Sequence, residues 1–332
     1  NKKGVTLVEL MITLVIFAVV ISMIYSVFNA FVKQATSERK TAKTEMDVIN
    51  VAWPMLKEIQ SAGFGAPKFS CSPSNYQCAC GIAVADQDGD GINDLIIHST
   101  ASGDSANAGK WSYIGSSCLV TNMYASTGGN NVVVIDNTTK SRLGPTTLPT
   151  VTSSDLITSC DSSYVTNVAY WSPFSASPDI ECYETIYFLQ TYGAGERPAM
   201  CEGNTRRVTR SSRARANDPS RQTILDCVFG TDTSTPADTG FNYRFGCISS
   251  SGNLTWQTGT NCGTSKLRLV KIGIVVQSSM QRDIQSPVTI TLFEGLRDST
   301  GASLEVVIDL TNAQRNYKWR KLEQTITLKN LE

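Results

Sequence analysis

Histidine is nearly absent from this sequence, and so is any excess of charge. His98 is the only histidine among 332 residues, which excludes histidine-rich metal sites and leaves any catalytic triad to depend on one residue. Basic and acidic residues number 29 each, so a net charge of zero gives no general attraction to nucleic acid or anionic lipid. The Gly-x-Ser-x-Gly, P-loop and dinucleotide-binding fingerprints are also missing. We therefore expect a protein that is not an enzyme.

Cysteine is absent from the N-terminal helical region but frequent beyond it. Zinc sites need paired Cys-x-x-Cys motifs or added histidines, and here only Cys78 and Cys80 lie close together. We therefore favour as many as five disulfides over metal ligation, and an oxidising compartment. The ten cysteines are Cys71, Cys78, Cys80, Cys118, Cys160, Cys182, Cys201, Cys227, Cys247 and Cys262.

Charge is almost absent from the run between Val5 and Val32, in which Glu9 is the only charged residue. As a helix, this run would span about 42 Å, more than the hydrocarbon core of about 30 Å. A secretory signal peptide would have a shorter apolar region followed by a small-residue cleavage site, whereas this run continues into a polar helical pattern. An acid at bilayer depth costs about 2 to 3 kcal/mol, so Glu9 is expected to have a function and a partner.

The junction Lys2-Lys3-Gly4 followed by Val5-Thr6-Leu7-Val8-Glu9-Leu10 resembles the class III leader of type IV pilins and type II secretion pseudopilins. In that family a prepilin peptidase cuts after the glycine and methylates the new N-terminus. The resemblance implies that Gly4 ends the leader and that Val5 is the mature N-terminus, where Phe or Met is commoner. It also implies that Glu9 pairs with the N-terminal ammonium of a neighbouring subunit. Two charges that are each costly in an apolar filament core become tolerable together.

The segment from Lys33 to about Ala62 predicts an amphipathic helix, because charged residues alternate with an apolar stripe. Pro54 costs about 3 kcal/mol inside a helix, so a kink or a break is expected near residues 50–53. Gly63 and Gly65 are expected to end the helix. The stripe consists of Met46, Ile49, Trp53, Leu56 and Ile59.

From residue 66 onward the pattern changes to short β-prone runs between turn-rich loops. The fold class is therefore α+β: a long N-terminal helix packed on a mostly antiparallel sheet. We expect a leader remnant (1–4), a transmembrane or filament-core helix (5–32), an amphipathic stalk helix (33–65) and a disulfide-rich β-sheet head (66–332). Predicted strands are 81–85, 95–99, 132–135, 185–189, 223–229, 266–278, 304–309 and 324–328, with long polar loops at 101–110, 136–155, 231–240 and 249–265.

Five further segments are similar to PilW-family minor pilins. They are Trp53–Gly65 at the end of the stalk, the paired runs Thr223–Val228 and Phe241–Gly246, the strand Val270–Ser278, and the basic run and closing strand Tyr317–Asn330. The resemblance is dense over the first 65 residues and patchy over the last 110. It does not cover the middle, which holds most of the cysteines. The PilW family is related to pseudopilin J of type II secretion, which is generally shorter and poorer in cysteine.

A second motif lies between two predicted strands, where acids occupy relative positions 1, 3, 5 and 9 and a glycine occupies position 6. An EF-hand-like loop wraps Ca²⁺ in this way. The expected ligands are the side chains of Asp86, Asp88, Asp90 and Asp94 with the carbonyl of Ile92. Ile97 replaces the bidentate glutamate expected at position 12, so the match is to a half loop. An ordinary Asp-Gly hairpin turn is the alternative.

A third feature is a predicted basic loop that contains Arg206, Arg207, Arg210, Arg213 and Arg215. Such a loop could hold DNA phosphates. No aromatic residues are interleaved to stack on bases, so a solvated loop, or one that docks on an acidic neighbouring subunit, is favoured.

The resemblance implies a minor pilin that primes or caps a type IV pilus. Its implied partners are other major and minor pilins, the prepilin peptidase and the inner-membrane assembly platform. Its implied location is the inner membrane with a periplasmic head before assembly, and the extracellular pilus afterwards. A pseudopilin J-like subunit, a tip adhesin and a DNA-binding module remain as alternatives.

Overall fold

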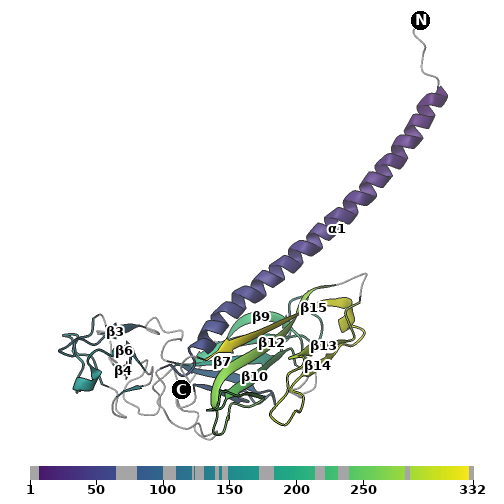
Figure 1. Ribbon diagram of the computed structural model, residues 1–332. Helices are drawn as coiled ribbons and strands as arrows, with labels where there is room; N and C mark the ends of the chain where they lie inside the picture. The colour runs from purple at the N-terminus through teal and green to yellow at the C-terminus, as the bar shows by residue number, and fades with distance from the viewer. Residues whose placement is uncertain are drawn as a thin grey trace. The chain divides into compact units, whose positions relative to one another are not determined.

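The structure, a computed structural model, describes residues 7–64, 81–99, 110–121, 123, 131–138, 142–143, 149–171, 183–213, 221–230, 239–280 and 285–328. The chain divides into two compact units, Asn1–Ile49 and Asn50–Glu332. Helix α1 (Leu7–Gln60) contributes to both units, and the strands all belong to the second (Figure 1). A long apolar helix followed by mostly antiparallel strands confirms the α+β class.

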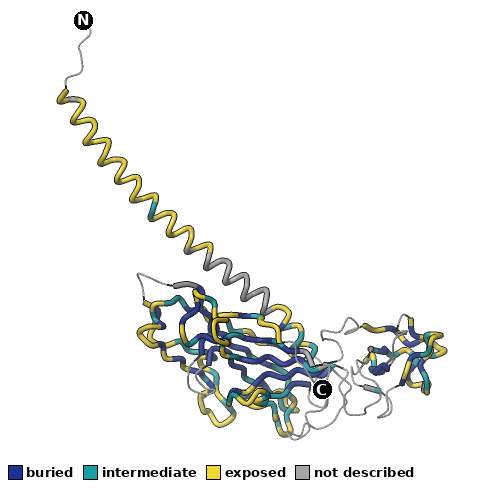
Figure 2. The backbone as a smooth tube through the Cα atoms, turned by 180° about the vertical axis from the view of Figure 1, so that it is seen from behind, coloured by how far each residue is buried: buried dark blue, intermediate teal, exposed yellow. Residues whose placement is uncertain are grey.

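The first unit contains only helical residues among those described. Its described side chains are almost all exposed, and Figure 2 shows this part of the helix as an exposed stretch. The break expected near residues 50–53 does not occur, because α1 continues through Pro54 to Gln60. As predicted, the helix ends before Gly63, whose φ of +76° suits glycine and whose N–H donates to the carbonyl of His98 at 2.8 Å.

The buried face of the helix end differs from the predicted apolar stripe. Met55 and Ile59 are 2% and 0% exposed, and Ala62 just beyond the helix is fully buried as well. These residues are spaced by four and three, so they share one helical face. Trp53 is 62% exposed instead, with the Lys57 ammonium 5.4 Å from its ring centroid. The predicted stripe therefore included Trp53 wrongly, because a shift in the apolar pattern places Met55 against the core.

The second unit is built on a nine-stranded sheet in which neighbouring strands pair antiparallel. The long strand β12 is central: β15 pairs along one side of it, while β10 and β9 pair along the other. The strand order is β1 (Ile82–Ala85), β2 (Asp94–Ser99), β7 (Tyr183–Gln190), β8 (Arg206–Arg213), β9 (Gln222–Val228), β12 (Lys266–Met280), β10 (Phe241–Ile248) and β11 (Leu254–Gln257), with β15 (Tyr317–Thr327) beside β12.

Two smaller sheets complete this unit. One is the four-stranded sheet β3 (Trp111–Tyr113), β6 (Val168–Trp171), β4 (Val132–Ile135) and β5 (Arg142–Leu143), which has its own buried cluster around Val132, Val134 and Tyr164. The other is the hairpin β13 (Thr289–Leu292) and β14 (Val306–Asp309), which packs with Phe229 and Trp319. Short 3-10 helices occupy Ser162–Tyr164 and Gln314–Asn316. Strands β5 and β11 lie inside segments predicted as loops.

A charged cluster ties the end of α1 to the sheet. The Arg210 guanidinium on β8 donates to both carboxylate oxygens of Glu58, from Nε at 3.1 Å to each and from Nη2 at 2.6 Å to Oε1. The Tyr187 hydroxyl on β7 donates to Oε2 of the same carboxylate. Burial, and then the Glu58 charge, raise the pKa of Tyr187 well above its usual value, so the phenol stays a donor. We call Glu58, Tyr187 and Arg210 the helix anchor.

Removing the carboxylate of the helix anchor should destabilise the second unit. Glu58→Ala takes away the acceptor of the Arg210 and Tyr187 bonds at a mostly buried position, which should lower the free energy of unfolding by about 3 kcal/mol. Chemical unfolding of the full chain in detergent micelles measures it. Glu196→Ala is the matched control, because Glu196 is 53% exposed in its pair with Arg207 and should cost less than about 1 kcal/mol. If both variants lowered the free energy of unfolding equally, the helix anchor would have no special role in stability.

Candidate functional site

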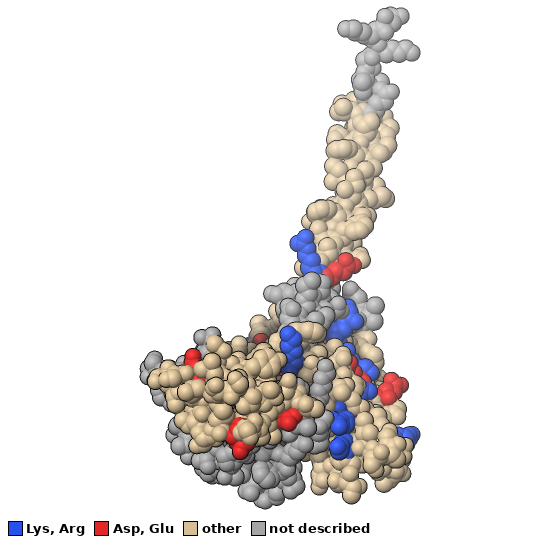
Figure 3. Space-filling model, turned by 60° about the vertical axis from the view of Figure 1, so that its left-hand side comes forward, with Lys and Arg blue, Asp and Glu red and all other residues tan. Residues whose placement is uncertain are grey.

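The apolar part of α1 is the first candidate site. Residues Leu10–Thr36 form a segment of 27 residues with a mean hydropathy of 2.6, long and apolar enough to cross a membrane. The hydroxyls of Thr13 and Thr36 donate to the carbonyls of Leu10 and Val32, so neither needs water. Figure 3 shows the described surface of this helix as uncharged over most of that length. The segment therefore presents a largely apolar surface, with the hydroxyls of Thr13 and Thr36 bonded within the helix.

The predicted processing and assembly residues precede this segment or lie at its start. Gly4 and Val5 lie outside the described residues. Glu9 lies in the first turn of α1, and its side chain is not among those described. The processing site at Gly4 and Val5, and the pairing of Glu9 with a neighbouring N-terminus, stay predictions.

The acidic loop predicted to bind calcium connects β1 to β2. The Asp86 carboxylate accepts the backbone N–H groups of Gly89 at 2.7 Å and Gly91 at 2.9 Å. Both glycines have positive φ, +78° and +81°, which residues with a Cβ rarely adopt. Carboxylate oxygens of Asp86, Asp88 and Asp94 lie within 4.8 Å of one another. The fold therefore gathers three of the four predicted acids.

Burial changes the proton affinity of two of these acids. It raises the pKa of Asp94, which is 2% exposed, to about 7, although the backbone N–H of Gln87 donates to its Oδ2 at 2.8 Å. Burial, and then the neighbouring Asp90 charge, also raise the pKa of Asp88. A cation among these oxygens would relieve the repulsion between like charges and would compete with the proton on Asp94.

Asp90 does not join the cluster, which corrects the alternating ligand pattern. Its Oδ1 accepts the backbone N–H of Ile92 at 2.8 Å, and its Oδ2 lies 3.3 Å from Nη1 of Arg206. Asp88 also faces an arginine, since Nη1 of Arg221 lies 3.4 Å from its Oδ2. These arginines offset part of the charge that a cation would neutralise. Calcium binding stays a prediction, with the Asp-Gly turn as its alternative.

The predicted basic loop is a strand. Arg206 to Arg213 form β8, which pairs with β7 and β9, and Arg215 lies outside the described residues. The arginine head groups meet carboxylates of this same chain: Arg206 pairs with Asp90, Arg207 with Glu196 at 3.0 Å, and Arg210 with Glu58. Pairing lets the aliphatic stems pack in a sheet, which a sequence pattern alone does not reveal. The expectation of a solvated loop is therefore wrong for these three residues.

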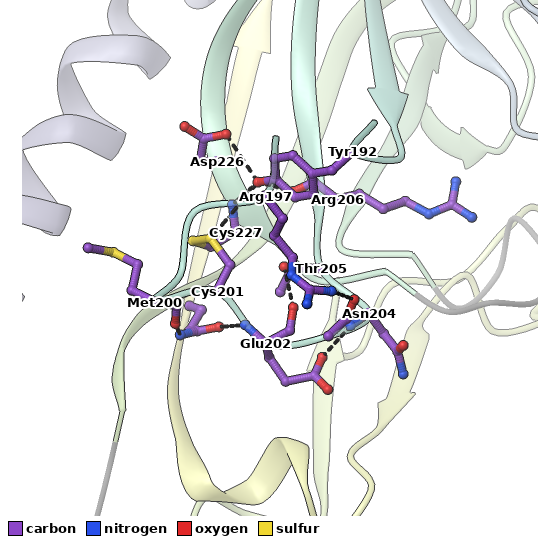
Figure 4. Close-up of a disulfide and its surroundings, with 12 residues drawn as sticks. Tyr192, Arg197, Met200, Cys201, Glu202, Asn204, Thr205, Arg206, Asp226 and Cys227 are labelled. Atoms are coloured by element: carbon purple, nitrogen blue, oxygen red, sulfur yellow. Dashed lines mark hydrogen bonds between the residues drawn. A yellow bond between two sulfur atoms is a disulfide. The ribbon is translucent and has the colours of Figure 1, made fainter. Parts of the chain in front are cut away.

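Six of the ten cysteines form disulfides, as predicted. The bridges are Cys118–Cys160, Cys201–Cys227 and Cys247–Cys262, while Cys71, Cys78, Cys80 and Cys182 lie outside the described residues. The second bridge joins the β7–β8 connection to β9. There the Tyr192 hydroxyl accepts the backbone N–H of Cys227 at 2.8 Å and donates to Oδ1 of Asp226 at 3.1 Å (Figure 4). Such bridges constrain the unfolded chain, which favours the folded head.

His98, the single histidine, is part of the sheet. Its ring is 2% exposed, and Nε2 lies 3.0 Å from Oε2 of Glu184 on the neighbouring strand β7. A cross-strand pair of this kind gives the buried Nε2 of His98 a partner, and the Glu184 side chain remains 19% exposed. The geometry therefore points to a structural role for His98.

Residues 1–25 match the family described as the prokaryotic N-terminal methylation motif. The match covers the leader junction and most of the apolar run, and it indicates a protein of the type IV pilin-like class. An apolar helix behind a prepilin-type leader is consistent with membrane anchoring. No curated protein matches the chain, and no solved structure does.

Calcium should stabilise the full chain if the acidic loop binds it. At a hundred times the dissociation constant, mass action contributes about 2.7 kcal/mol, so melting temperatures in calcium and in chelator should differ by about 5 °C or more. Asp88→Asn keeps the side-chain shape, removes one of the three converging carboxylates and should abolish the difference. Calcium affinity should also rise as the pH passes through 7, because Asp94 must lose its proton to bind.

Two controls make this calcium experiment decisive. Asp90→Asn alters an acid of the same loop whose oxygens are bonded to Ile92 and Arg206, so it should retain most of the calcium effect. Magnesium should substitute poorly, because it requires stricter octahedral geometry and gives up water reluctantly. If the unaltered protein has the same melting temperature in calcium and in chelator, the loop does not bind calcium and is an ordinary Asp-Gly turn.

Proposed function

We propose that this chain is a minor pilin of a type IV pilus, which primes or caps filament assembly and whose head contributes to adhesion. The strongest support is the combination of the methylation motif at residues 1–25 with the exposed apolar segment Leu10–Thr36. The partners proposed are other major and minor pilins, the prepilin peptidase and the inner-membrane assembly platform.

The apolar segment supports assembly into a filament. An exposed apolar surface of this length is unfavourable in water, so the chain needs a bilayer or other apolar helices around it. A membrane supplies that cover before assembly, and neighbouring pilin helices supply it afterwards. Glu9 fits this route, because a carboxylate that leaves the lipid for a filament core needs a cation there. The mature N-terminal amine of a neighbouring subunit is that cation in the proposal.

The position of the PilW-like segments supports the finer assignment. Thr223–Val228 lies in β9, Phe241–Gly246 in β10 and Val270–Ser278 in β12, and the closing strand β15 pairs with β12. Segments that are scattered in the sequence thus form one continuous part of the nine-stranded sheet. A resemblance that follows a structural unit is stronger support than one scattered over unrelated surface. A pseudopilin J-like subunit of type II secretion remains the second candidate.

The arginines of β8 argue against a DNA-binding head. Arg206, Arg207 and Arg210 each pair with a carboxylate of the chain, so their charge is largely offset before any phosphate could bind.

Processing gives the direct test of the pilin assignment. The mature protein should begin at Val5 and carry an N-methyl group, because the peptidase cuts after Gly4. N-terminal mass spectrometry of protein purified from the membrane and from sheared pili measures this. A mature chain that retains Lys2-Lys3-Gly4, or that is cut after the apolar run, would contradict the proposal.

Replacing Glu9 should separate membrane insertion from assembly. Glu9→Ala removes a charge from an apolar helix, so insertion should be unchanged or improved. Its abundance in the pilus fraction should fall at least about tenfold, which corresponds to about 1.4 kcal/mol. Quantitative immunoblots of the membrane and pilus fractions provide the readout. Glu38→Ala is the matched control on the same helix, beyond the apolar segment, and should assemble normally. Equal incorporation of both variants would remove Glu9 from the mechanism.

A further inference from the structure

Three aromatic side chains gather on one face of the small four-stranded sheet. Trp111 and Tyr113 are two residues apart on β3, so they project from the same face. Their ring centroids are 5.2 Å apart and their planes meet at 87°. Tyr170 on β6 lies directly opposite Trp111, so it belongs to that face too. We call Trp111, Tyr113 and Tyr170 the aromatic corner.

The aromatic corner is accessible, although aromatic side chains are usually covered. Trp111 is 49% exposed and Tyr113 is 59% exposed, whereas Tyr170 is partly buried and its ring meets that of Phe64 edge to face, with the centroids 4.8 Å apart. Burial, and then the charge of the Tyr113 phenol, raise the pKa of Tyr170, so its hydroxyl stays protonated. The corner thus presents the perpendicular rings of Trp111 and Tyr113 at the surface, with the partly buried Tyr170 on the same face.

The sheet beneath the aromatic corner holds it in place. Ser112 points to the opposite face, where its hydroxyl accepts the backbone N–H of Thr121 at 2.9 Å. On that face Val132, Val134 and Ala169 form a buried cluster, against which the Cys118–Cys160 bridge packs. The backbone that carries Trp111 and Tyr113 is therefore held before a ligand binds, which lowers the entropy cost of binding.

The size and charge of the aromatic corner select a class of ligand. Two half-exposed rings of this kind offer about 200 Å², whereas a standard protein interface needs about 800 Å² from each partner. Strands β3, β4 and β6 consist entirely of uncharged residues. A small, neutral ligand with one apolar face and many hydroxyl groups matches both features, and a pyranose ring has that chemistry.

We propose that the aromatic corner binds a neutral hexopyranose unit of a glycan. The C–H groups on one face of the sugar carry partial positive charge and stack on the electron-rich face of one ring, while its rim contacts the other ring. The Trp111 indole N–H and the hydroxyls of Tyr113 and Tyr170 provide hydrogen-bonding groups for the sugar hydroxyls. This inference deepens the adhesive part of the proposed function by naming the class of ligand that the head takes.

Direct binding to defined sugars tests this proposal. The full chain in lauryldimethylamine oxide micelles, a detergent without a sugar head group, is titrated with maltotetraose, cellotetraose and chitotetraose. Ligand-observed NMR detects contact, and calorimetry gives the dissociation constant. At least one of these neutral oligosaccharides should bind saturably. Trp111→Ala and Tyr113→Ala should each weaken that binding at least about fivefold.

Matched variants distinguish loss of a contact from loss of structure. Trp111→Phe keeps a ring and should retain most of the binding that Trp111→Ala loses. Trp53→Ala removes a tryptophan that is also well exposed, but on α1, and should bind like the unaltered protein. Near-ultraviolet circular dichroism and mapping of the Cys118–Cys160 bridge confirm that each variant is folded.

Three outcomes would overturn the proposal. They are the lack of saturable binding to all three sugars, binding by the Trp111→Ala and Tyr113→Ala variants that equals that of the unaltered protein, and a change in self-association on Trp111→Ala without any sugar binding. The last result would make the aromatic corner a protein contact instead. Because these measurements use purified protein, sugar binding by a chain that never enters pili would refute the assembly role and leave the ligand assignment intact.

Discussion

The structure depends on one constraint, which is that the apolar segment Leu10–Thr36 has no cover within its own unit among the described residues. A soluble fold would bury such a stripe against its own core, and this helix exposes it all round. An apolar surface of this kind is unfavourable in water, and favourable in lipid or among other apolar helices. An environment of this kind makes every polar group expensive, which is why the hydroxyls of Thr13 and Thr36 turn back onto the helix backbone.

The last turns of the same helix meet a different requirement, because they must connect to a folded head. Among the described side chains they bury Met55 and Ile59, followed by Ala62, which is a small apolar contact for the element that joins two units. The helix anchor adds directional hydrogen bonds. The Glu58 carboxylate accepts a forked pair from the Arg210 guanidinium and a further bond from the Tyr187 hydroxyl. Apolar packing tolerates sliding, whereas a charged, multiply bonded carboxylate fixes one position along the sheet.

Sequence patterns predicted those parts of the fold whose causes are local. Residues 132–135 form β4 as predicted, because a short β-branched run between turns needs no distant partner to become a strand. β8 was missed because its arginines are paired by Glu58, Asp90 and Glu196, and such partners cannot be identified from spacing. β3 and β6 are too short to show a period, so the aromatic corner had no signal in the sequence. The sequence did predict the acidic loop, because Asp86, Asp88 and Asp94 lie within nine residues of one another and their spacing can be read directly.

The pairing of Arg206 on β8, and of Arg221 just before β9, with the acidic loop also bears on how a cation would bind there. Arg221 faces Asp88, and their side chains are 30% and 15% exposed, so the pair is partly screened by water. Surface pairs of this kind contribute about 0 to 1 kcal/mol, which is less than a tenfold change in a binding constant. A divalent cation coordinated by three carboxylates could displace that arginine at little cost. The arginines therefore offset part of the charge of the loop, and they do not prevent it from binding a cation.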